Sequence, residues 1–130
     1  MTKSTKSKSG STFPRSPCPI TNALDLLGDK WTLVVIRDLF LGRRMYSDFQ
    51  SSSEGIPTNI LADRLKRLLE SGVINKEAYQ ERPVRYEYSL TTKGKALAPV
   101  IEEIGNWGLK YIDGTVAKLG KIKRGKLKFD

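Results

Sequence analysis

The sequence predicts a mainly α-helical domain with one small β-hairpin, an α+β fold of the winged helix-turn-helix class. Residues 56–71 place apolar side chains at three- and four-residue steps, which is the spacing of an amphipathic helix. Residues 84–90 alternate apolar and polar side chains, which is typical of a half-buried strand. Because the helix runs almost directly into the hairpin, the pair predicts a winged helix-turn-helix.

The positive charge of the chain is concentrated at its ends. The formal net charge is +9, yet residues 1–16 hold four basic side chains and no acidic one, and residues 118–130 hold six against one. Residues 17–117 therefore carry 13 basic and 13 acidic side chains. We expect a disordered basic tail at 1–16, one folded domain at 17–117 and a second basic tail at 118–130.

Residue composition argues against several functional classes. With one cysteine and no histidine, the chain has no internal disulfide, no Cys/His zinc site and no imidazole-dependent triad. A Gly-rich phosphate loop is also absent from the sequence. We therefore expect no enzymatic activity, no metal and no cofactor. Neither a signal peptide nor a membrane-spanning apolar run is evident, which predicts a cytoplasmic protein without a membrane partner.

Two helices are expected before residue 42. Pro19 suits the first position of a helix that Cys18 caps and Gly28 ends. Asp29 can cap a second helix over residues 30–41, whose apolar side chains surround most of its circumference. That second helix should be central to the core. In the first helix, Ile20, Ala23, Leu24 and Leu27 should form a buried apolar stripe.

The next two helices form the expected helix-turn-helix pair. Ser47 with Gln50 three residues later predicts a capping box for a short helix over 47–52, with Phe49 directed inward. The helix over 56–71 follows, and Gly72 provides its stop. Its polar face lies opposite its leucines, so this helix is the one that should enter a major groove.

The hairpin should have a four-residue loop, Gln80 to Pro83, because proline is tolerated in a turn and not in a paired strand. In the second strand, Val84, Tyr86, Tyr88 and Leu90 should face inward.

A final long helix should begin at Thr91 or Thr92, with Pro99 kinking its first turns. Its apolar surface can pack on its own domain or on a partner, and we favour a two-fold dimer because a DNA reader gains affinity from two half-sites. The apolar stripe comprises Leu97, Val100 or Ile101, Ile104, Trp107, Tyr111, Val116 and Leu119.

Candidate DNA contacts follow from the placement of polar side chains. The first turns of a helix in the major groove face the base edges, and the wing faces the backbone or the minor groove. Arg64 lies nearer the apolar side of its helix, so we expect its stem to pack and its charge to pair internally. The candidates are Thr58, Asn59, Ala62, Asp63 and Lys66 for bases, Arg67 for phosphate, Arg82 and Arg85 in the wing, and Ser47 and Gln50 near the backbone.

A plainer interpretation of the same charges remains open. The helix can be a solvated surface in which Asp63 pairs with Arg67 and Lys66 pairs with Glu70, each four residues apart. Arg85 can likewise pair with Glu77 or Glu87 across the hairpin.

Several motifs together resemble the HxlR family of winged helix-turn-helix transcriptional regulators. They are Cys18-Pro19 before the first helix, Lys30-Trp31-Thr32, a Leu-x-x-Arg-Leu pattern in the helix over 56–71, and Tyr86-x-Tyr88-Ser-Leu-Thr leading to Gly94. The resemblance covers residues 17–113. Pro57 stands where a hydroxyl residue is common in the family, and Met45-Tyr46 stands where Arg-Phe is usual.

The resemblance implies a homodimer joined by its terminal helices, with paired recognition helices in successive major grooves of double-stranded DNA. A pseudo-palindromic operator would match that symmetry. The dimer interface would then include Ile20, Leu24, Ile101, Ile104, Trp107 and Tyr111.

Cys18 is a candidate sensor of oxidants or electrophiles. A thiolate at a helix N-terminus meets unpaired N–H groups and the positive end of the helix dipole, which lowers the thiol pKa. Some members of the resembled family sense oxidants or quinones through a cysteine at this position. With a single cysteine, sensing requires an intersubunit disulfide, a mixed disulfide or direct alkylation. The alternative is a small packed residue without reactivity.

The sequence thus predicts a homodimeric, sequence-specific DNA-binding transcriptional regulator with an oxidant or small-molecule effector. The rival hypotheses are a winged-helix protein-interaction module, which the neutral body favours, and a sequence-neutral architectural DNA binder that works through its tails. A MarR-like regulator with an aromatic ligand pocket is a neighbouring alternative.

Overall fold

The computed structural model describes residues 13–116 of the 130-residue chain. These residues fall into two compact parts, which divide after Leu33. The basic tail expected after residue 117 lies outside the described residues, as do the first 12 residues of the N-terminal one.

The first part contains helix α1, Pro19–Leu27, with the bounds that the sequence predicts. Cys18 is its N-cap residue in an extended conformation, and Pro19 begins the helix. Arg15, from the segment expected to be a tail, donates a hydrogen bond from Nη2 to Asp25 Oδ1 at 2.6 Å. This surface ion pair joins the chain before α1 to the helix itself.

Helix α2, Thr32–Phe40, starts two residues later than predicted. The carboxylate of Asp29 accepts a hydrogen bond from the Trp31 N–H at 3.2 Å and another from the Thr32 hydroxyl. Lys30 and Trp31 therefore form a turn around the Asp29 side chain, and the helix begins only after that turn.

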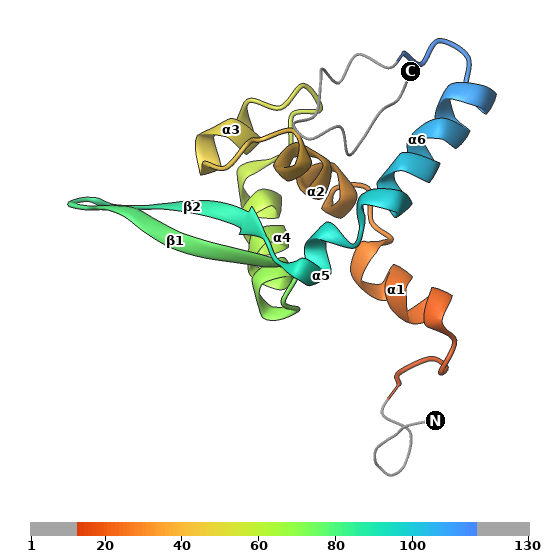
Figure 1. Cartoon of the computed structure of the whole chain (residues 1–130), viewed down its shortest axis with the longest axis horizontal. Helices are drawn as coiled ribbons and strands as arrows, with labels where there is room; N and C mark the ends of the chain where they lie inside the picture. Colours follow the sequence, from red (N-terminus) through yellow and green to blue (C-terminus); the bar gives the residue numbers. More distant parts are fainter. Residues whose placement is uncertain (1–12, 117–130) are drawn as a thin grey trace. The chain divides into compact units, whose positions relative to one another are not determined.

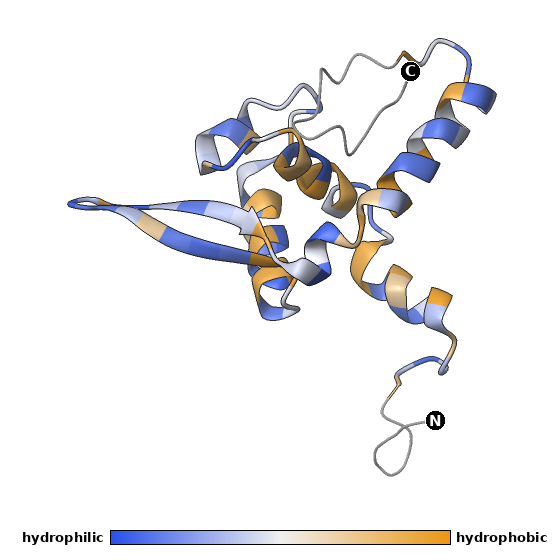
Figure 2. Ribbon diagram, viewed as in Figure 1, coloured by the Kyte–Doolittle hydropathy of each residue, from blue (hydrophilic) through white to orange (hydrophobic). Residues whose placement is uncertain are grey.

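The second part contains the rest of the fold, in the order α2, α3, α4, β1, β2, α5, α6 (Figure 1). Helix α3 spans Tyr46–Gln50 and helix α4 spans Thr58–Glu70. The winged helix-turn-helix fold is confirmed. Much of α2 and α4 is hydrophobic in Figure 2, whereas most of the hairpin is hydrophilic. The buried apolar side chains are Val35, Ile36, Leu39, Phe49, Ile56, Leu61, Leu65, Leu68, Val73, Ile74, Tyr88 and Ile101.

The predicted capping box of α3 is wrong. The helix begins at Tyr46, so Ser47 occupies its second position and cannot act as the cap. Instead the carboxylate of Asp48 accepts hydrogen bonds from the Arg44 and Met45 N–H groups, at 3.1 and 3.0 Å. The chain before α3 is extended because Met45 bridges to Glu87 of the hairpin, and this pairing fixes the start of the helix.

The hairpin pairs β1, Ile74–Glu81, with β2, Val84–Leu90, as antiparallel strands. Its turn contains only Arg82 and Pro83, two residues fewer than predicted, because pairing continues to Glu81 opposite Val84. A bulge lies between Ala78 and Gln80.

The alternation of β2 buries only the end of the hairpin next to the helices. Tyr88 is buried, but Val84 and Tyr86, expected to face the core, are exposed. The outer half of the hairpin extends beyond the helices, so neither of its faces has a core to cover (Figure 1).

The single C-terminal helix that the sequence predicts is in fact two helices. Helix α5 spans Thr92–Lys95, and helix α6 spans Ala98–Tyr111. Pro99 lies in the first turn of α6, where its missing N–H needs no partner, so the proline marks a new helix rather than a kink. Val116 lies beyond the end of α6, and Leu119 is outside the described residues.

The junction after α4 is fixed by tight backbone contacts. Gly72 ends the helix with a φ of 77°, a conformation that favours glycine. The Thr91 hydroxyl donates to the Gly72 carbonyl at 2.6 Å and accepts from the Gly94 N–H at 3.1 Å. The end of the hairpin is thereby joined to the end of α4.

Gly94 is the residue at this junction that tolerates no side chain. A Cβ there would lie 2.2 Å from the Val73 carbonyl oxygen, which is a backbone atom and cannot move aside. We expect Gly94→Ala to lower the free energy of unfolding by about 1–3 kcal/mol in urea denaturation. The control is Gly108→Ala in α6, where a Cβ meets no atom within 4 Å. Equal stability of the two variants would contradict the account.

Candidate nucleic-acid interface

Helix α4 separates its side chains into a buried face and an exposed face. Leu61, Leu65 and Leu68 are 0–2% exposed and anchor the helix in the core. The side chains that are candidates for base reading are all exposed on the other side of the helix: Thr58, Asn59, Ala62, Asp63 and Lys66. All of them except Lys66 lie within the first two turns. Burial of the leucines therefore presents a polar surface sized for a major groove.

The start of α4 is held by side chains of α3. Tyr46 donates a hydrogen bond from its hydroxyl to the Thr58 carbonyl oxygen at 3.0 Å. Gln50 Nε2 lies 3.4 Å from Thr58 Oγ1, to which it donates. Gln50, expected near the DNA backbone, thus also contacts α4, and Tyr46 has a structural role that the sequence does not predict. Ser47 is exposed on the same short helix.

No side chain caps α4. Its N-cap residue is Pro57, which has no hydrogen-bonding side chain, and the helix starts two residues later than predicted. The contacts of α3 with Thr58 therefore hold the first turn of α4 in place of a cap.

The turn between α3 and α4 is fixed by an ion-pair network that the sequence analysis did not predict. Asp38 is 1% exposed, and its Oδ1 accepts hydrogen bonds from Arg37 and Arg43, at 2.8 and 3.0 Å for the Nη atoms. Arg37 also forms two 2.8 Å hydrogen bonds with the carboxylate of Glu54, which lies in the turn. Ser52 donates a further hydrogen bond to Glu54 at 2.8 Å.

Electrostatics at this network favour the charged states. Hydrogen bonding to Arg37 lowers the pKa of Glu54 to about 2, although partial burial of the carboxylate opposes the shift. The same contact raises the pKa of Arg37. Two carboxylates share the Arg37 guanidinium, so this side chain joins α2 to the turn that precedes α4.

Three charged residues of α4 are already engaged within the protein. Arg64 is 18% exposed and forms an ion pair with Asp63, which confirms the expectation that it packs and pairs internally. Asp63 is therefore paired with its neighbour and not presented as a free acceptor. Arg67, the candidate phosphate contact, is half-buried and also has an interaction within the chain.

Arg82 and Arg85 are both exposed on the wing. Arg82 is in the two-residue turn, and Arg85 lies directly opposite Gln80. Glu77 lies opposite Glu87, so the register does not place either glutamate opposite Arg85. Within residues 13–116, the structure shows no ion pair for either arginine.

In the first part of the structure, Cys18 lies at the N-terminus of α1 and is partly exposed. The neutral thiol makes no capping hydrogen bond. The backbone N–H of Thr21, the Thr21 hydroxyl and the Ile20 N–H can hydrogen-bond the thiolate, and these donors lower the pKa of Cys18. The pKa of this thiol is thus lowered, as expected for a thiol at the N-terminus of a helix.

Most of the side chains assigned to a dimer interface are exposed. On α6, Ile104, Trp107 and Tyr111 are 53–60% exposed, and the Trp107 and Tyr111 rings lie 5.4 Å apart. On α1, Ile20 and Leu24 are also exposed. The prediction of a buried stripe on α1 is therefore wrong for the single chain, because none of the residues of this helix is buried. Ile101 differs from these because it is 6% exposed, so it belongs to the core and is not available to a partner.

Other kinds of site are not supported by residues 13–116. Within that range, His, Cys, Asp and Glu side chains do not gather in a group that could hold a metal ion. None of the helices there combines the length and the apolar character needed to span a membrane.

The helix-turn-helix and the wing both match a known family model. Residues 26–116 match the family described as HxlR-like helix-turn-helix. The chain belongs to this family. It is 38% identical, over 97 residues, to the HTH-type transcriptional regulator YvaP of Bacillus subtilis strain 168, covering 74% of this chain and 90% of YvaP.

Solved structures of similar proteins have the same fold. The crystal structure of PA1607 superposes with a TM-score of 0.70 at 38% identity, covering 78% of this chain and 72% of that one. The redox regulator HypR in its oxidized form superposes with a TM-score of 0.68 at 29% identity, and the match covers 74% of this chain and 99% of the HypR chain.

The network at the helix-turn-helix turn gives a pH prediction. Because Glu54 has a pKa of about 2 in the folded chain against an ordinary 4.5, its contribution to stability is complete above pH 4.5 and is lost as the pH falls toward 2. The Glu54 side chain is 37% exposed, so solvent screening limits the effect of Glu54→Gln at pH 7 to about 1 kcal/mol of unfolding free energy.

Urea denaturation at pH 7 and at pH 3 measures this effect. The destabilisation by Glu54→Gln should shrink at the lower pH. Glu103→Gln, which removes an exposed carboxylate from α6, is the control and should change little at either pH. A Glu54→Gln effect that is the same at both pH values would contradict the assigned role of the ion pair.

Proposed function

We propose that this protein is a sequence-specific DNA-binding transcriptional regulator that acts as a homodimer. The observation that carries the proposal is the exposed polar face of α4, anchored from behind by three buried leucines and flanked by a wing with two exposed arginines. The proposal is supported by membership of the HxlR-like helix-turn-helix family, and by relatives that are named transcriptional regulators.

Base reading is assigned to the first two turns of α4. Asn59 can form paired hydrogen bonds with adenine, and Lys66 can donate to guanine. Asp63 can accept a hydrogen bond from a cytosine amino group only if Arg64 moves away from the Asp63 carboxylate or shares that carboxylate with the base. Its contribution should therefore be smaller than that of Lys66.

Backbone contacts are assigned to Arg82 and Arg85 of the wing, and to Ser47, Gln50 and Arg67. Contacts to phosphates position the protein without reading sequence, and they make affinity strongly salt-dependent. The tails, which hold most of the excess positive charge, would add nonspecific attraction.

The homodimer proposal rests on the apolar side chains that α6 leaves exposed. Ile104, Trp107 and Tyr111 lie on one helix at three- and four-residue steps, and their exposure in a single chain is costly unless a partner covers them. Two recognition helices held by a two-fold dimer would fit a pseudo-palindromic operator with half-sites one helical turn apart.

Two substitutions separate base reading from backbone contact. On a duplex selected from random sequence, Lys66→Ala should cost about 1–3 kcal/mol of binding free energy and relax the preference at one base position. Arg82→Ala should weaken selected and random duplexes equally and reduce the salt slope by about 1. Fluorescence anisotropy across a salt series measures both.

The control is Lys95→Ala, which removes an exposed positive charge from α5. Lys95→Ala should leave the preference for the selected duplex over random sequence unchanged. If neither Lys66→Ala nor Arg82→Ala changes binding, the roles of helix and wing are wrong, and a protein-interaction module is favoured instead. A sequence-neutral binder would bind selected and random duplexes alike and lose binding when both tails are removed.

We further propose that Cys18 senses oxidants or electrophiles. Its lowered pKa and partial exposure favour the reactive thiolate, and the similar HypR is named a redox regulator. Because each chain has one cysteine, a disulfide at Cys18 must join it to the partner's Cys18 or to a small thiol, whereas an electrophile adds directly to sulfur.

The thiol prediction concerns reactivity against pH. Alkylation of Cys18 by iodoacetamide should have its midpoint below pH 9.0, the ordinary thiol value, because hydrogen bonds stabilise the thiolate. Thr21→Val removes one of these donors and should move the midpoint upward. Diamide or a quinone should alter DNA affinity in wild type and not in Cys18→Ser. Identical responses of these two proteins would contradict the sensor role.

A further inference from the structure

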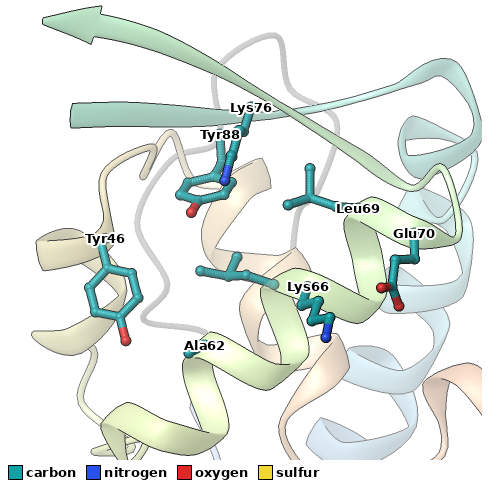
Figure 3. Close-up of a pocket in the computed structure, with 8 residues that line it drawn as sticks. Tyr46, Ala62, Lys66, Leu69, Glu70, Lys76 and Tyr88 are labelled. Atoms are coloured by element: carbon teal, nitrogen blue, oxygen red, sulfur yellow. The ribbon is translucent and has the colours of Figure 1, made fainter. Parts of the chain in front are cut away.

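A cavity of about 440 Å³ lies between α3, α4 and the wing, directly beside the proposed base-reading face (Figure 3). Leu65 and Leu69 of α4 provide apolar lining. The rings of Tyr46 and Tyr88 line the cavity from α3 and the hairpin. Its volume lies within the range of small-molecule sites, about 300–1,000 Å³.

The two aromatic walls are held by contacts outside the cavity. Tyr88 is 8% exposed, and its ring packs against Phe49 in an edge-to-face arrangement with 6.1 Å between centroids. Tyr46 is tied by its hydroxyl to the Thr58 carbonyl at 3.0 Å. Both rings are therefore held in place without a ligand, and aromatic walls favour a flat apolar group.

The charged side chains at the cavity favour an anion. Lys66 of α4 and Lys76 of β1 both line it and are exposed, while Glu70 contributes the one carboxylate in the lining. A cationic ligand would meet two ammonium groups there, whereas a carboxylate would meet them as partners.

Lys76 is unusual because it lies on the inward face of the hairpin. It is opposite the buried Tyr88, between Ile74 and Ala78 on the same face of β1. Its ammonium group lies 4.3 Å from the centroid of the Tyr86 ring. The lysine therefore brings a positive charge to the aromatic side of the cavity while it remains exposed to solvent.

We propose that this cavity binds a small planar aromatic carboxylate. The aromatic body lies over Leu65 and Leu69 between the two tyrosine rings, and the carboxylate pairs with Lys66 and Lys76. Because Lys66 is also assigned to a DNA base, the ligand displaces DNA; this second statement rests on the proposed function.

Binding is tested first without DNA, with 2-naphthoate as the probe in calorimetric titrations and in NMR spectra of the labelled full-length chain. The largest amide shifts should lie at Ala62, Leu65, Lys76 and Tyr88. Lys76→Gln should weaken binding at least fivefold, whereas Lys95→Gln on α5 should not. The neutral 2-naphthylmethanol and the non-aromatic cyclohexanecarboxylate should both bind more weakly than 2-naphthoate.

Three results would overturn the site: no binding at millimolar 2-naphthoate, shifts centred elsewhere, or equal affinity of wild type and Lys76→Gln. Comparable binding of the neutral alcohol would remove the role of the lysines and so contradict the ligand class.

The DNA step is tested separately. Saturating 2-naphthoate should weaken binding of the selected duplex at least fivefold in wild type and less in Lys76→Gln. Unchanged DNA affinity with an occupied cavity would refute displacement. A chain that binds 2-naphthoate as described but discriminates no duplex would refute the proposed function and leave the cavity assignment supported.

Discussion

The fold depends on one constraint: α4 can bury only one of its sides. Leu61, Leu65 and Leu68 lie against the core, and each buried leucine contributes about 1.5–3 kcal/mol, whereas an exposed ion pair on the opposite face contributes at most about 1 kcal/mol. The leucines therefore decide how the helix is rotated. The five side chains of α4 assigned to DNA bases are exposed as a consequence of that rotation.

Rotation does not fix where the helix begins and ends, and polar contacts do this. At the start, Arg37 joins Asp38 to Glu54 in the turn, and the side chains of α3 hold Thr58. At the end, Gly72 and Gly94 allow the hairpin to approach the last turn of α4. The reading helix and the wing are thus positioned by the same short junctions, which is why Lys66 and Lys76 line one cavity.

Periodicity was sufficient to predict α1, α2, α4, the hairpin and the exposed face of α4, because each of these depends on side chains close together in sequence. It did not predict the break between α5 and α6. Contacts between distant residues were not predictable in this way. The Arg37–Glu54 pair joins residues 17 positions apart, and the start of α3 depends on the pairing of Met45 with Glu87. The exposure of Val84 and Tyr86 depends on how far the hairpin extends beyond the core.

In the proposed complex, two copies of α4 read DNA in successive major grooves. A hydroxyl-radical footprint on the selected duplex distinguishes this arrangement from the alternatives. We expect two protected segments with related sequence, centred about 10 base pairs apart on one side of the duplex, with protection of the flanking backbone by the wings. A single protected segment, or uniform protection that is the same on random sequence, would contradict it.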